Sequence, residues 1–157
     1  MGPAFLPWCE SVPSMTPLQL TLMAIPTDRN GYATLGGRPK SDRRPIIAEA
    51  IYNASGGRCV ICGEEADPRT THGARSFQLG HLVPAGPKHL GWVPGNIASQ
   101  CGACNGAAGN TNLVPYIPMF ALPDGILTEW PLGRRGGQYI DERALREAAR
   151  RKLGLPF

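Results

Sequence analysis

Two Cys-x-x-Cys pairs constrain this 157-residue chain more than any other feature of its sequence. The first pair is Cys59 and Cys62, and the second is Cys101 and Cys104. A Cys-x-x-Cys turn directs two thiolates at one metal ion, and two such turns supply the four sulfur ligands of a closed tetrahedral zinc site. The pairs therefore predict that a structural Zn²⁺ ion, bound by all four cysteines, joins the two ends of residues 63–100 and makes them part of one module.

The composition favours a fold that depends on this metal. The chain has 20 glycines and 16 prolines, which is more turn-forming residue than a compact core of this length needs. Cys9 is a fifth cysteine outside the two pairs, and an odd count with paired spacing is typical of a reducing compartment. We therefore expect a cytoplasmic location. A formal net charge of +4 allows a polyanionic partner without selecting one.

Polar residues between the cysteine pairs form a second pattern. Residues 77–83 alternate partly with a period of two, which predicts a strand that carries His81. The second cysteine pair fits the first turn of a helix, and this helix would direct Asn105 toward that strand. Asn96 lies between the two elements, where its carboxamide can hydrogen-bond backbone groups and fix one loop across another.

Together with the cysteine pairs, the spacing His-x14-Asn-x8-Asn at His81, Asn96 and Asn105 resembles the HNH endonuclease family, the zinc-bound ββα-metal nucleases. The resemblance covers roughly residues 45–112 and implies a small α+β, treble-clef-like fold. It implies that His81 is the general base that deprotonates water, and that Asn96 holds the strand of the histidine in place. It also implies that Asn105 binds a catalytic divalent cation, Mg²⁺ or Mn²⁺.

The residue types suit these roles. A neutral imidazole, with an ordinary pKa near ~6.5, accepts a proton at cellular pH. A hard divalent cation prefers oxygen ligands, and an asparagine carbonyl is one. The resemblance thus implies hydrolysis of DNA phosphodiesters, with DNA as the partner. Small members of the family are frequent in phages, so phage packaging or recombination proteins in a host cytoplasm are implied as further partners, with the oligomeric state left open.

Two departures from the family pattern support an alternative. Gly80 stands where relatives carry Asp, Glu or His as a second metal ligand, and residues 106–109 lack the basic residue that often follows Asn105. Gln78 lies on the same strand face as Gly80 but matches no family position. The nearby residues Asp67, His72 and His89 match none either. The alternative is a catalytically degenerate zinc module that binds DNA or a protein without cleavage.

The flanks divide the chain into three segments. Residues 1–44 read as an irregular, proline-rich arm, in which residues 18–25 are at most a short strand or docking segment and too short to span a bilayer. Residues 45–112 form the expected nuclease domain, which opens with a helix near Pro45 whose apolar stripe includes Ile47 and Ile51. Residues 113–157 read as an extended strap followed by a basic helix.

Several basic side chains are candidates for contacts with DNA phosphate. The basic helix near the C-terminus presents either a solvated face or a phosphate-binding surface. Trp92 reads as a cover for the zinc core, with stacking on a base as the alternative. The candidate phosphate ligands are Lys88, Arg146, Arg150 and Arg151.

Overall fold

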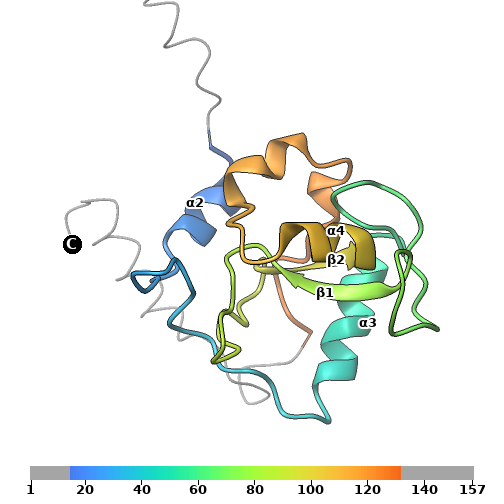
Figure 1. The fold of residues 1–157 in the computed structure, drawn as a ribbon, viewed down its shortest axis with the longest axis horizontal. Coiled ribbons are helices and arrows are strands. Elements are labelled where there is room, and N and C mark those ends of the chain that lie inside the picture. Colours follow the sequence, from blue (N-terminus) through green and yellow to red (C-terminus); the bar gives the residue numbers. More distant parts are fainter. Residues whose placement is uncertain (1–14, 132–157) are drawn as a thin grey trace, which may run out of the picture.

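A two-stranded antiparallel sheet lies at the centre of residues 15–131, the part of the chain that the computed structural model describes (Figure 1). Strand β1 (Phe77–His81) pairs with β2 (Ile97–Cys101). Helix α3 (Arg44–Ala54) precedes the sheet, and helix α4 (Gly102–Ala108) follows β2 without a break. The expected small α+β fold is present to this extent.

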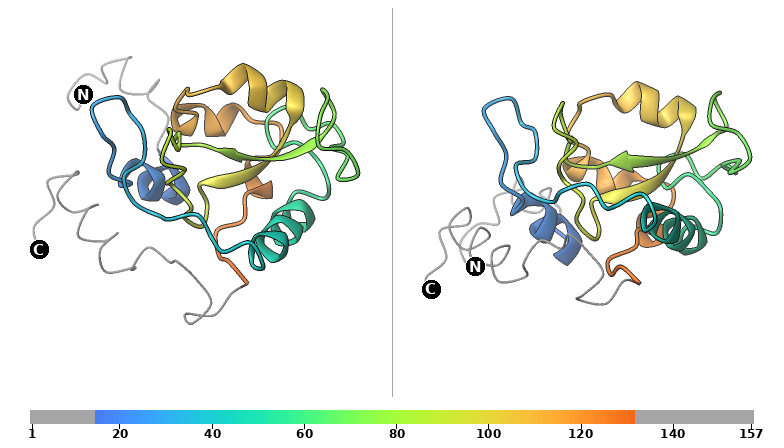
Figure 2. Two further views of the ribbon diagram at one scale, coloured as in Figure 1. Left: turned by 60° about the horizontal axis from the view of Figure 1, so that its bottom comes forward. Right: turned by 90° about the horizontal axis from the view of Figure 1, so that it is seen from below.

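The sheet has helices on both faces, as the two views of Figure 2 show, with α4 on one side and α3 on the other. On the α3 side, the buried cluster consists of Ile47, Ile51, Trp92, Ile97 and Trp130. On the α4 side, a larger cluster consists of Leu22, Ile25, Ala33, Val60, Leu82, Val83, Val93, Ala98, Leu113, Val114, Ile117, Phe120 and Ile126. This larger cluster takes side chains from all three segments of the expected organisation.

Residues 17–23 form a helix, α2 (Pro17–Met23), so the expected short strand is wrong, whereas the alternative of a docking segment agrees with the packing of this helix against the core. Thr16 caps the helix, because its hydroxyl accepts a hydrogen bond from the Gln19 amide at 3.2 Å while the Gln19 side chain accepts one from the Thr16 amide at 3.0 Å. Pro17 occupies the first turn, where the missing N–H has no helical partner in any case. Leu22 then packs in the larger cluster.

Helix α3 confirms the helix expected near Pro45. Ile47 and Ile51 are fully buried, one turn apart on the face toward β2. The helix ends before Gly56 and Gly57, which have φ values of +64° and +75°, a backbone conformation that favours glycine. This turn leads the chain directly to the first cysteine pair.

The extended conformation expected for the strap that begins at residue 113 is wrong. Residues 114–119 form a 3-10 helix, η1 (Val114–Met119), and a second one, η2 (Pro123–Gly125), follows. Proline fixes φ near the helical value, so the prolines that rule out a strand are compatible with short 3-10 turns. Val114 and Ile117 are buried and pack in the same cluster as α2.

The described chain contains no helix that is both long and apolar enough to cross a lipid bilayer. Cys9 lies outside the described residues. The expected basic helix lies outside them too, together with its candidate phosphate ligands Arg146, Arg150 and Arg151.

Candidate metal centre and histidine site

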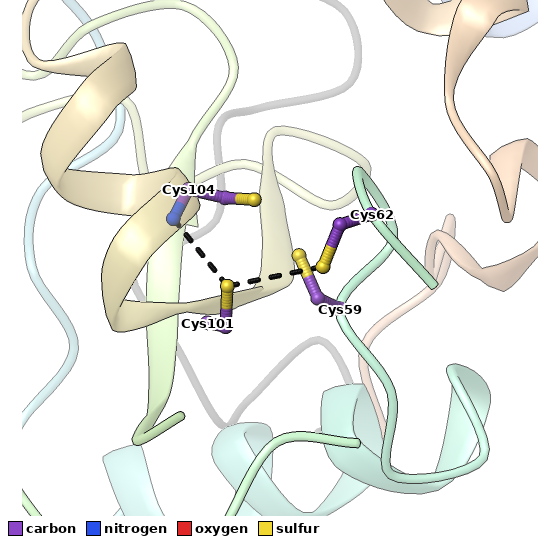
Figure 3. A group of neighbouring side chains, drawn as sticks. All are labelled: Cys59, Cys62, Cys101 and Cys104. Atoms are coloured by element: carbon purple, nitrogen blue, oxygen red, sulfur yellow. Dashed lines mark hydrogen bonds between the residues drawn. The ribbon is translucent and has the colours of Figure 1, made fainter. Parts of the chain in front are cut away.

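Four cysteine sulfur atoms converge between the loop after α3 and the start of α4 (Figure 3). The Sγ atoms of Cys59, Cys62, Cys101 and Cys104 all lie within 4.8 Å of one another, and those of Cys62 and Cys101 are 3.9 Å apart. A tetrahedral zinc ion with bonds of ~2.3 Å places its sulfurs about 3.8 Å apart, whereas a disulfide joins sulfurs at about 2.05 Å. The cluster therefore fits a structural zinc or a similar metal ion.

The backbone forms each cysteine pair into a tight turn. In the first turn, the Gly63 amide donates to the Cys59 carbonyl at 2.8 Å, and Gly63 has the left-handed φ of +77° expected from its position. In the second, Cys101 is the N-cap of α4, and its Sγ accepts a hydrogen bond from the Cys104 amide at 3.4 Å. Each turn thus directs two sulfurs toward the other pair.

Arg75 is a charged residue beside these sulfurs that the sequence did not indicate. Its Nη2 donates to Cys101 Sγ at 2.8 Å and lies 4.0 Å from Cys62 Sγ, while Nη1 pairs with the Glu64 carboxylate. Nothing in loop residues 64–76 signals that this side chain turns back toward the cysteines. A guanidinium here offsets the negative charge that four thiolates bring to a divalent ion.

The thiols differ in their proton affinity. Burial raises the pKa of Cys62, but hydrogen bonds from the Glu64 backbone and from Arg75 outweigh this effect and bring its pKa down to about 7. Burial raises the pKa values of Cys59 and Cys104. The exposed Cys62 therefore becomes a thiolate more readily than Cys59 or Cys104 before a metal ion binds.

His81 ends β1, and its imidazole is largely enclosed. Its ring lies edge-on to Trp92, with the centroids 5.6 Å apart, and its Nε2 is buried without a hydrogen-bond partner among the described residues. Burial lowers the pKa of His81 to about 4, and a hydrogen bond with the backbone of Leu90 opposes that shift. The imidazole is therefore neutral at cellular pH.

Trp92 has a different role from the one expected. It is only 6% exposed, so its ring cannot stack on a nucleic-acid base. It packs with the cluster on the α3 side and against His81, instead of covering the cysteine group as expected. By contrast, His72, Lys88 and His89 lie exposed in loops.

Asn96 makes the hydrogen bonds that the sequence predicts. Its Oδ1 accepts from the Val83 amide at 2.7 Å, and its Nδ2 donates to the carbonyls of Val83 at 3.1 Å and Gly91 at 2.8 Å. The side chain is fully buried. Asn96 therefore joins the end of the strand that carries His81 to the loop that contacts the imidazole.

Asn105 contacts β1, but not through His81. Its Nδ2 donates to Gln78 Oε1 at 2.7 Å. Because side chains alternate along a strand, Gln78 and Gly80 face α4 whereas His81 faces the opposite side with Trp92. The expectation that the strand of His81 faces this helix is correct, and the His81 side chain itself lies on the other face of the strand.

Gly80 and Gln100 occupy the remaining part of the α4 face. A Cβ on Gly80 would lie 2.1 Å from Gln100 Cδ, so the glutamine side chain fills the space where a residue-80 side chain would begin. Gln100 is fully buried, and neither its Oε1 nor its Nε2 has a hydrogen-bond partner among the described residues. Sequence analysis missed Gln100, whose position on β2 becomes visible only from the strand register.

Within residues 15–131, no second group of three or more His, Cys, Asp or Glu side chains converges like the four cysteines. A second cation site in this region would therefore depend on amide oxygens. A comparison with models of protein families finds no match for this chain, and comparisons with curated proteins and with solved structures find no similar protein.

Proposed function

We propose that this protein is a metal-dependent DNA endonuclease of the HNH type, with His81 as its general base. The observation that carries the proposal is the state of the imidazole. One nitrogen bonds the backbone of Leu90, and Nε2 is buried without a partner in the described structure, so its enclosure must open before water can reach it. A backbone carbonyl that accepts from one ring nitrogen leaves the other nitrogen as a proton acceptor, which is the tautomer that a general base requires.

The surroundings of His81 support this role by fixing its orientation. Trp92 limits the rotation of the ring, and Asn96 fixes the loop that supplies the Leu90 backbone. A base that is held in one orientation loses little freedom when water and DNA bind. The same arrangement would also suit a buried structural histidine, but such a residue usually has both ring nitrogens paired.

The proposed cation ligand is Asn105. Its Nδ2 is engaged by Gln78, so its carbonyl oxygen is the atom that remains for a hard cation. When bound, Mg²⁺ or Mn²⁺ would stabilise negative charge on the phosphate and on the departing 3′-oxygen. In an in-line displacement the attacking and leaving oxygens lie on opposite sides of phosphorus. Both groups must act on the same phosphate, whereas the side chains of His81 and Asn105 lie on opposite faces of β1, and this arrangement favours the second candidate below.

The four cysteines hold a structural zinc ion in this proposal. They leave no open coordination position, because four thiolates complete a tetrahedron. The exposed Lys88 lies two residues before Leu90 in the loop that contacts His81, and it is the described residue that we assign to DNA phosphate. The net charge of +4 is compatible with DNA as the substrate, and we further propose a phage-encoded enzyme that acts in a host cytoplasm.

The test is nicking of supercoiled plasmid by the zinc-loaded protein with Mg²⁺, Mn²⁺ or EDTA. The His81→Ala variant should keep its zinc and its fold, but its cleavage rate should fall by at least about 100-fold, as expected for loss of a general base. The His72→Ala variant, at an exposed loop histidine, is the matched control and should cleave like the parent. Equal cleavage by His81→Ala would remove the base assignment.

The second candidate is a zinc module that binds DNA or a protein without cleaving. Gly80 favours it, because this position provides no side chain for a cation. Intact zinc and fold without cleavage under any of the three conditions would select this candidate.

A further inference from the structure

The basic side chains of the described structure differ in whether the fold supplies them with a carboxylate. Residues 15–131 contain nine Lys and Arg residues, and three of them form ion pairs. The three paired residues lie in residues 58–75, which also supply their partners: Arg58 with Glu65, Arg69 with Asp67 and Arg75 with Glu64. The positive charge around the first cysteine pair is therefore balanced within the protein.

A second group of cations lies in residues 38–44, which we call the basic segment. Four side chains carry its positive charge, and none of them forms an ion pair with a described residue. Asp42 is the one carboxylate of the segment, so its net charge is +3. The four cations are Arg38 and Lys40, which are exposed, and Arg43 and Arg44, which are partly buried.

Two backbone hydrogen bonds hold the chain just before this segment against the loop that contacts His81. The Gly91 amide donates to the Leu35 carbonyl at 2.7 Å, and the Trp92 amide donates to the Gly36 carbonyl at 3.0 Å. Gly36 has a φ of +86°, and a Cβ there would lie 2.8 Å from the Trp92 nitrogen, so this close approach requires glycine. From Gly36 the chain runs along the lower edge of the molecule in Figure 1 to the start of α3.

Lys88 belongs to the same region of the surface. It is exposed, forms no ion pair with a described residue, and lies three positions before Gly91. Arg38 lies two positions after Gly36 on the other side of the same backbone contact. Unpaired cations therefore flank the place where the basic segment meets the loop of His81.

Two of the cations stand where they do not help α3 to form. Arg43 is the N-cap of the helix and makes no capping hydrogen bond, and Arg44 is the first helical residue. The first turn contains no acidic residue that would offset them. The amino end of a helix disfavours cations and favours short polar caps such as Ser or Asp. Helix stability does not account for these two arginines, whereas a negatively charged partner would make their position favourable.

We propose that the basic segment, together with Lys88, is a surface that binds the phosphate backbone of duplex DNA. The identity of the partner rests on the proposed function, in which DNA is the polyanion. Cleavage is not required, so the surface suits the non-cleaving zinc module equally. Phosphates are bound by charge without an apolar centre, whereas protein interfaces usually have one. Among the exposed large apolar side chains of residues 15–131, Ile46 is the one next to the segment.

The test is binding of the zinc-loaded full chain to a short fluorescent duplex of random sequence at several NaCl concentrations, without Mg²⁺ or Mn²⁺. Two double variants remove two cations each: Arg38→Gln with Lys40→Gln, and Arg43→Gln with Arg44→Gln. Each should weaken binding at least about 10-fold at low salt. Each should also reduce the slope of log affinity against log salt by about 2, because one phosphate contact contributes about 0.9. Fluorescence anisotropy measures both quantities.

The matched control is Arg58→Gln with Arg69→Gln, which removes the same formal charge from two ion-paired residues and should keep the slope of the parent. Arg43→Lys with Arg44→Lys should keep it too, because lysine supplies the same charge. Zinc content and a thermal melt verify the fold, and the variant at the exposed Arg38 and Lys40 decides if the other does not fold. A folded segment variant with the salt slope of the parent, or an equal loss in the control, would overturn the proposal.

The outcomes separate this inference from the proposed function. Binding that depends on the basic segment, in a protein that never nicks plasmid, would support the surface and remove the nuclease. Equal cleavage, with equal salt dependence, by the parent and both segment variants would support the nuclease and remove the surface. Displacement of the duplex by polyglutamate at the same concentration of charge would assign the surface to acidic proteins and overturn the choice of DNA.

Discussion

The carboxamide of Asn96 hydrogen-bonds both polar groups of the Val83 backbone, with Oδ1 accepting from the amide at 2.7 Å and Nδ2 donating to the carbonyl at 3.1 Å. Such a pairing imitates the bonds between two strands, although Val83 lies beyond the end of β1. One side chain therefore continues the sheet past its last backbone pair. The same Nδ2 also reaches Gly91, so the loop between the strands is fixed at two points.

Asn96→Ala should destabilise the protein strongly. The substitution removes three buried hydrogen bonds and leaves backbone groups unpaired, so we expect a loss of about 3 kcal/mol in the free energy of unfolding. Urea denaturation measures the change. The control is Asn112→Ala, which removes a single bond from the Val114 amide at an exposed site and should cost about 1 kcal/mol or less. Similar losses in the two variants would contradict this reading of the loop.

Cys101→Ser should release zinc and abolish the cooperative melt. The binding energy of a structural site is part of the folding energy, on the order of 10 kcal/mol for small zinc modules. Zinc content by mass spectrometry and a thermal melt test this together. Cys9→Ser, at the cysteine outside the two pairs, should retain one zinc per chain. A Cys101→Ser protein that melts cooperatively without zinc would show that the metal does not hold the fold.

Arg75→Ala should speed the transfer of zinc to a chelator while leaving the fold intact. The variant loses the hydrogen bond from Nη2 to Cys101 Sγ, and loss of such outer contacts commonly weakens metal binding about 10-fold. The rate of zinc transfer to a coloured chelator is the measurement. Arg69→Ala is the matched control, because Arg69 pairs with Asp67 on an exposed loop and should leave the rate unchanged. Equal rates in both variants would mean that Arg75 has no influence on the metal.

His81 should make the protein less stable as the pH falls. Its pKa is about 4 in the folded protein against an ordinary 6.5, so between these values the unfolded chain takes up a proton that the folded chain refuses. The stability that the neutral, buried His81 allows is fully present above pH 6.5. It is lost progressively as the pH falls toward 4, because the unfolded chain is then favoured by protonation. His81→Leu should remove this part of the pH dependence, as seen by denaturation at several pH values. His72→Ala, at an exposed site, should retain it, and parallel curves for all three proteins would disprove the effect.

The sequence predicts the features that depend on short spacings. Both cysteine pairs converge as the Cys-x-x-Cys pattern indicates, and α3 follows its apolar stripe and its early proline. The hydrogen bonds of Asn96 were foreseeable, because a carboxamide between two loops has few other partners than backbone groups. The catalytic roles of His81, Asn96 and Asn105 stay predictions.

The sequence does not predict the features that depend on strand register or on tertiary contacts. Whether His81 or Gln78 faces α4 depends on a single step in the alternation along β1, and a partly alternating pattern does not fix that step. Pro17 can interrupt a strand or begin a helix, and the capping by Thr16 decides between the two. Arg75 reaches the cysteines only because loop residues 64–76 fold back, which no local pattern indicates.

The distance along the chain between the two cysteine pairs affects how the protein acquires its fold. Joining Cys62 to Cys101, 39 positions apart, closes a ring of chain that contains all of β1 and the Asn96 loop. For a covalent link of this span, closure removes entropy from the unfolded state worth about 4 kcal/mol. An isolated two-stranded hairpin is barely stable in water. If a metal ion binds the four cysteines, closing this ring reduces the entropy that β1 and β2 lose when they pair, so metal uptake should favour the strand of His81.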